Sequence, residues 1–115
     1  MISDDSGAVR LLLKDILIIG QHQIVGEATN GIETVEQYTA LKPDVVLLDM
    51  AMPKKDGLSA LREILAINPH AKVIMITASD NQKTIKECLM SGASGYILKP
   101  FNFEQVLKTI TEITM

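Results

Sequence analysis

This chain of 115 residues has little of several features that point to particular classes of protein. Cys88 is the only cysteine, so no disulfide can form within the chain, and a reducing, cytoplasmic location is expected. Tryptophan is absent and only two Phe and two Tyr occur, so surfaces that could stack on bases are scarce. The net charge is -3 and no segment gathers Lys and Arg into a stripe, which argues against nucleic acid as a partner.

Long apolar runs are missing as well. The runs at residues 11–13 and 16–19 are separated by Lys14 and Asp15, and both are far shorter than the roughly 20 residues that cross a bilayer. The first five residues include Asp4 and Asp5, whereas a secretory signal needs positive charge there. We therefore expect neither membrane insertion nor export.

The composition that remains is that of a globular protein. Hydrophobic residues make up 47% of the chain, and most of them are aliphatic. A length of 115 residues is sufficient for one hydrophobic core but not for two ordinary domains. We expect a single domain over residues 1–115.

Apolar periodicity alternates along the chain between helix-like and strand-like segments, with Gly, Pro, Asn or Asp at the changes. Asn102 and Gln105 form a capping box that begins the last helix. Helices are predicted over residues 6–19, 32–41, 58–67, 81–90 and from 102 onward, and strands over 24–28, 45–48, 73–76 and 95–98. Alternating elements of these lengths predict an α/β fold with a doubly wound parallel sheet.

Polar residues follow three predicted strands, at Asp49, Thr77 and Lys99, and the pair Asp4-Asp5 follows a very short apolar start. Taken singly, most of these residues have a structural explanation, because an aspartate can cap a helix and a threonine can simply end a strand. Together they favour chemistry, because clustered carboxylates stay ionised only with a cation among them. Carboxylate oxygens suit Mg²⁺, and a lysine and a hydroxyl beside them suit phosphoryl transfer.

These motifs resemble the CheY-like receiver domains of two-component response regulators. The acidic pair, Leu48-Asp49-Met50, Asp56-Gly57, Ile76-Thr77-Ala78 and Lys99-Pro100 occur in the order and spacing of that family, over nearly the whole chain. The resemblance implies a flavodoxin-like sheet with strand order 2-1-3-4-5. The first strand would be unusually short, because only three residues precede the acidic pair.

The resemblance also assigns roles to the residues at the strand ends. Asp49 is implied as the acceptor of a phosphoryl group from a histidine kinase. Mg²⁺ is implied as the cofactor, bound by Asp5, Asp49 and the backbone carbonyl of Ala51, with Asp4 acting mainly through water. Lys99 would pair with Asp49 at rest and with the phosphoryl group afterwards.

A switch is implied as well. Thr77 would move to hydrogen-bond the phosphoryl group, and Tyr96 would turn into the space that Thr77 leaves. The change would reach the last two helices and the last strand, where a downstream protein would bind. The implied function is a stand-alone, chemotaxis-type response regulator that catalyses only its own phosphorylation and dephosphorylation.

Two features depart from the family pattern. The short first strand suggests a chain that begins upstream, a partner or swapped strand that fills the gap, or a sheet that tolerates the loss. A pseudo-receiver that binds partners without phosphorylation is therefore the alternative function. Ile18-Ile19 stand where polar residues are common, and a larger core is the simpler interpretation than a homodimer contact.

Two enzyme classes fit the residues less well. A small hydrolase with Asp49 as nucleophile would need a general acid two residues later, where Ala51 stands. A flavin-binding protein would need a hydroxyl-rich phosphate loop, whereas Asp4 and Asp5 would repel a phosphate.

Overall fold

The computed structural model describes residues 1–114 and contains one parallel sheet with the strand order β2-β1-β3-β4-β5. Both the predicted α/β class and the implied order are therefore confirmed. The strands are β1 Ile2–Ser3, β2 Glu27–Ala28, β3 Val46–Asp49, β4 Val73–Thr77 and β5 Gly95–Leu98. The helices are α1 Gly7–Ile19, α2 Gly31–Leu41, α3 Gly57–Ile67, α4 Gln82–Met90 and α5 Phe103–Thr114.

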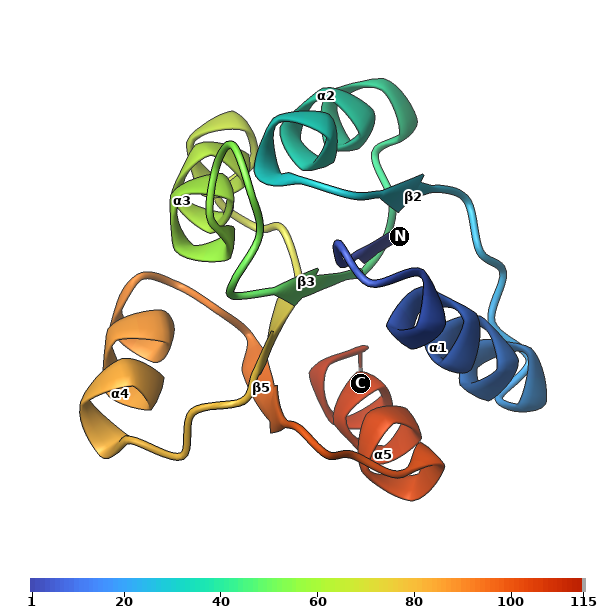
Figure 1. Cartoon of the computed structure of the whole chain (residues 1–115). Coiled ribbons are helices and arrows are strands. Elements are labelled where there is room, and N and C mark those ends of the chain that lie inside the picture. The colour runs from blue at the N-terminus through green and yellow to red at the C-terminus, as the bar shows by residue number, and fades with distance from the viewer. Residues whose placement is uncertain (115) are drawn as a thin grey trace.

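The helices cover both faces of the sheet, with α1 and α5 on one face and α2, α3 and α4 on the other (Figure 1). Each face buries its own aliphatic core. Leu13 of α1 and Ile110 of α5 pack on Ile74 and Ile76, while Leu61 and Cys88 pack on the opposite face. The central strands β3 and β4 are buried on both sides, as expected of near-continuous hydrophobic strands in a parallel sheet.

Local side-chain caps begin several of the helices. Ser6 caps α1 by accepting a hydrogen bond from the amide of Val9, and Asp56 caps α3 in the same manner. Asn102 and Gln105 exchange hydrogen bonds of 3.0 and 2.9 Å, so the predicted capping box before α5 is confirmed. The loops that carry polar residues are thereby tied to rigid helices.

The first strand is as short as the sequence implies. It contributes two residue pairs to each neighbour, whereas β3 and β4 share four pairs. The carbonyl of Met1 also accepts a hydrogen bond of 2.9 Å from the amide of Leu47. The chain's own β1 therefore completes the strand order.

Three details of the sequence interpretation are wrong. The strand expected over residues 24–28 contains only Glu27–Ala28, because β1 offers too short a ladder to order the residues before it. Ile18 and Ile19 do not enlarge the core, since they are 65% and 66% exposed on the outer face of α1. The spacing of Ile85, Cys88 and Leu89 predicts that all three lie on one apolar face of α4, but Leu89 is 43% exposed.

Membrane insertion was not expected from the sequence. Among the elements that the structure describes, none of the helices has the length and apolarity to cross a membrane.

Candidate functional site

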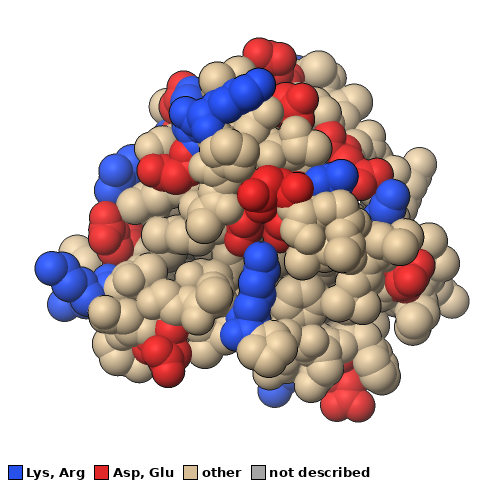
Figure 2. Space-filling view, in the orientation of Figure 1, with Lys and Arg blue, Asp and Glu red and all other residues tan. Residues whose placement is uncertain are grey.

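The predicted polar residues gather at one edge of the sheet. Asp49 and Thr77 end β3 and β4, and Lys99 directly follows β5. Asp4 and Asp5 follow β1, which lies beside β3 in the sheet. Parallel strands bring their carboxyl ends to the same edge, and acidic side chains gather near the middle of the face shown in Figure 2.

Asp49 is the last residue of β3, and the chain around it is closely packed. The residue is only 4% exposed, and its Oδ1 atom lies 3.1 Å from the Nζ atom of Lys99. The amide of Met50 donates a hydrogen bond to the carbonyl of Ile76, which fixes the chain directly after Asp49. A Cβ at Gly57 would lie 2.2 Å from the carbonyl oxygen of Asp49, so only glycine allows this close approach.

Asp4 is fully buried and has a more elaborate set of contacts than the sequence suggests. Its Oδ2 atom lies 3.2 Å from the Nζ atom of Lys99, and its Oδ1 atom accepts a hydrogen bond of 2.9 Å from the amide of Ser6. Lys99 therefore bridges two carboxylates, Asp4 and Asp49. The family resemblance implied only the contact from Lys99 to Asp49. The strand order, however, places the ends of β1 and β3 side by side, which brings Asp4 to the same lysine.

Carboxylate oxygens of Asp4, Asp5 and Asp49 lie within 4.8 Å of one another. Asp5 is exposed, so this cluster is open to solvent on one side. Ala51 lines the same pocket, where a backbone carbonyl could add a further oxygen ligand. Few carboxylates, hard oxygen ligands and access for water are what Mg²⁺ prefers, so these residues fit that ion.

The pKa values of Asp49 and Lys99 reflect the crowding of charge. Burial raises the pKa of Asp49, and the negative charges of Asp4 and Asp5 raise it further, although the hydrogen bond from Lys99 opposes this. For Lys99, burial alone would lower the pKa. The hydrogen bonds and charges of Asp49 and Asp4 outweigh burial, so the net effect is a raised pKa and a lysine that stays protonated.

Thr77 is 4% exposed and borders the pocket that contains Asp49 and Lys99. Its hydroxyl oxygen accepts a hydrogen bond of 3.1 Å from the amide of Ser79. Tyr96 lies on the edge strand β5, is 39% exposed and is absent from the pocket lining. The structure thus brings Thr77 to the acidic residues and leaves Tyr96 on the outer surface.

Ser79 and Thr84 also line the pocket, and Thr84 comes from the first turns of α4. No sequence motif indicated Thr84 as part of the site. Nothing in the local pattern distinguishes Thr84 from a solvent-exposed helical threonine, because only the packing of α4 beside β4 and β5 brings it to this pocket.

The chain matches a known protein family over almost its whole length. A model of the response regulator receiver domain matches residues 1–111. The chain belongs to the response regulator receiver family. Receiver domains are signalling modules rather than classical enzymes.

Two chemotaxis proteins are similar to this receiver over almost the full length of both chains. The chemotaxis protein CheY of Thermotoga maritima is 40% identical over 114 residues, which cover 99% of this chain and 95% of the relative. CheY of Bacillus subtilis is 38% identical, covering 97% and 93% of the two chains. A crystal structure described as the CheX-CheY-BeF3-Mg+2 complex of Borrelia burgdorferi contains a chain that superposes with a TM-score of 0.96 at 34% identity, covering 99% and 87%.

Proposed function

We propose that this receiver accepts a phosphoryl group from a histidine kinase on Asp49, with Mg²⁺ as cofactor. The observation that carries the proposal is the bridge from Lys99 to Asp49 and Asp4, with the three acidic side chains within 4.8 Å of one another. Burying a pair of acids beside a lysine costs stability, and such costly clusters of charge are concentrated at functional sites.

The proposed step is a transfer between two nucleophiles. A carboxylate oxygen of Asp49 attacks the phosphorus of a phosphohistidine, the new O–P bond forms, and the P–N bond breaks with its electron pair left on the imidazole. The carboxylate of Asp49 would be the nucleophile, as aspartate carboxylates are in other covalent phosphoryl transfers. Bound Mg²⁺ would neutralise charge on the phosphoryl oxygens.

Lys99 and Thr77 both line the pocket and would support the same step. Lys99 is protonated and only 25% exposed at its side chain, so it can follow the charge from the carboxylate of Asp49 to the phosphoryl group. The hydroxyl of Thr77 accepts a hydrogen bond from the amide of Ser79, so its own proton can be donated to a phosphoryl oxygen when Thr77 moves toward it. That movement would shift the loop that leads into α4.

The shift would change the surface formed by α4, β5 and α5, which we propose as the binding site for a downstream protein. This surface carries apolar side chains that are not packed in the core, with Met90 77%, Tyr96 39% and Phe103 49% exposed. Tyr96 would turn inward when Thr77 moves. The chemotaxis proteins among the relatives favour a chemotaxis-type output.

Incubation with Mg²⁺ and acetyl phosphate, followed by intact mass measurement, tests the proposal. Wild-type protein should gain one phosphoryl group and Asp49→Asn none. Fluorine NMR with beryllofluoride provides a second measurement, because the mimic should bind the wild type in the presence of Mg²⁺ only.

A folded wild-type protein that takes up neither group would contradict the proposal and favour the pseudo-receiver alternative, in which the two-residue β1 leaves the acidic pair too weakly placed. Uptake that persists in Asp49→Asn would show that another residue is the acceptor.

A further inference from the structure

Asp4 and Asp5 lie where the sheet gives them little support, because β1 ends at Ser3 after only two residues. The amide of Asp4 donates a hydrogen bond of 3.1 Å to the carbonyl of Ala28, which extends the pairing with β2 by one step. The carbonyl of Asp4 has no strand partner there. A buried carbonyl must find another donor, and that donor is a side chain.

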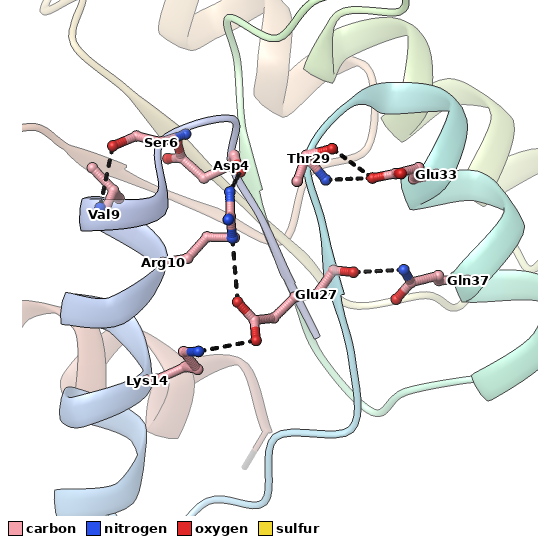
Figure 3. Close-up of polar contacts among 9 residues, drawn as sticks. All are labelled: Asp4, Ser6, Val9, Arg10, Lys14, Glu27, Thr29, Glu33 and Gln37. Atoms are coloured by element: carbon pink, nitrogen blue, oxygen red, sulfur yellow. Dashed lines mark hydrogen bonds and ion pairs between the residues drawn. The ribbon is translucent and has the colours of Figure 1, made fainter.

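The donor is Arg10, in the first turn or so of α1. Its Nη1 atom donates a hydrogen bond of 2.7 Å to the carbonyl oxygen of Asp4. Its Nε atom donates to Glu27 of β2 at 3.2 Å, so the guanidinium is held from the other side (Figure 3). Glu27 also accepts from Lys14 at 3.1 Å, which anchors it to α1 at a second point.

The contact to Asp4 affects both acidic residues. The carbonyl group of Asp4 belongs to the planar peptide unit that joins Asp4 to Asp5. A donor that fixes this peptide plane fixes the direction in which both side chains leave the backbone. The carboxylate of Asp4 then meets Lys99, while that of Asp5 remains exposed beside it.

We infer that Arg10 is a positioning residue for the acidic pair, performing with a side chain what a longer first strand would perform with a ladder of hydrogen bonds. The consequence for Mg²⁺ rests on the proposed function. Contacts that orient metal ligands typically change metal affinity by about 10- to 100-fold when they are removed.

A purely electrostatic role of Arg10 would change the Mg²⁺ affinity in the opposite direction. The guanidinium is a positive charge close to the acidic cluster, so its removal would strengthen the binding of a cation if charge alone mattered. The positioning role predicts weaker binding. The direction of the change therefore separates the two interpretations.

Lys14 provides a matched control. Arg10→Gln and Lys14→Gln each remove one positive charge and one ion pair with Glu27, but only Arg10 contacts Asp4. Any difference between the two variants then reports the contact to the Asp4 carbonyl rather than the general loss of an ion pair.

Two measurements test the inference. In the metal-free protein, hydrogen exchange of the Asp4 amide should accelerate by roughly fivefold or more in Arg10→Gln relative to Lys14→Gln, with exchange in β3 and β4 matched between them. In NMR titrations with Mg²⁺, the affinity should fall about tenfold in Arg10→Gln and stay near the wild-type value in Lys14→Gln.

Equal exchange at Asp4 in both variants, or unchanged or tighter Mg²⁺ binding in Arg10→Gln, would overturn the inference. If Arg10→Gln does not fold, the same measurements are made on Arg10→Lys. A single ammonium group does not bind the Asp4 carbonyl oxygen and the Glu27 carboxylate at the same time as the guanidinium does. Its exchange and affinity are judged in the same way. A wild type that binds no Mg²⁺ counts against the proposed function, and the exchange rates alone then decide the role of Arg10.

Discussion

The two halves of the sheet hold the clustered carboxylates by different means. On β3, Asp49 ends a buried strand with four residue pairs to β4, and its backbone position follows from that ladder. On β1, Asp4 and Asp5 follow two residues, and their backbone is held by a side chain from α1 and by the last carbonyl of β2. A site can therefore be assembled at one sheet edge even where one of its strands is minimal.

The two halves of the sheet also differ in how much buried apolar surface they contribute to stability. The half formed by β3, β4 and β5 contains most of the buried aliphatic residues of the sheet, whereas the β1–β2 half contributes fewer pairs and holds a buried hydroxyl without a partner among the described residues. We therefore expect core substitutions on β4 to destabilise the protein strongly, and substitutions around β1 to change the site or to improve the packing.

The largest effect is expected from truncation in the strong half. Ile76 is fully buried directly before Thr77, so Ile76→Ala should lower the free energy of unfolding by about 2–5 kcal/mol through lost burial and a cavity. Urea denaturation measures this loss. A loss below about 1 kcal/mol would mean that β4 is not the stable centre of the sheet.

Asp49→Asn should raise the stability of the metal-free protein, on the order of 1 kcal/mol, because it removes one of three crowded carboxylates while Lys99 keeps Asp4 as a partner. The sign depends on pH. Since the pKa of Asp49 is raised in the folded state, its ionisation costs stability as the pH rises from the ordinary aspartate range through the raised value.

Denaturation of both proteins across that pH range checks the effect. The advantage of Asp49→Asn should be absent in acid and should grow as the pH rises above the ordinary aspartate range. An advantage that is largest in acid would contradict the raised pKa, and Mg²⁺ should stabilise only the wild type.

Ser3→Ala tests the weak half. The hydroxyl of Ser3 is buried and has no hydrogen-bond partner among the described residues, so its removal should stabilise the protein by about 1 kcal/mol. Thermal unfolding in the absence of Mg²⁺ measures the gain. A destabilised variant would indicate that the hydroxyl makes a contact through bound water.

The smallest effect is expected outside both halves. Ile19→Gln replaces an exposed side chain on α1 and should change the free energy of unfolding by less than about 0.5 kcal/mol, in contrast to Ile76→Ala. Light scattering after size exclusion shows whether the same variant alters the oligomeric state. A homodimer lost on substitution would assign this face to self-association.

Much of the fold could be predicted because its signals are local. The buried run before Asp49 and the capping box at Asn102 depend on residues close in sequence, and the structure contains both of them. The family resemblance implied the strand order, which periodicity alone did not. Burial on α1 was misjudged at Ile18 and Ile19 because helix rotation relative to the sheet is set by distant packing.

The sequence by itself determined which residues could perform the chemistry, since Asp4, Asp5, Asp49, Thr77 and Lys99 stand at strand ends whose edge they must share. Only the tertiary structure decided how they are held. The bridge from Lys99 to Asp4 and the contact from Arg10 to the Asp4 carbonyl join residues on different elements. Such contacts depend on the spacing and rotation of helices and strands, which no local pattern encodes.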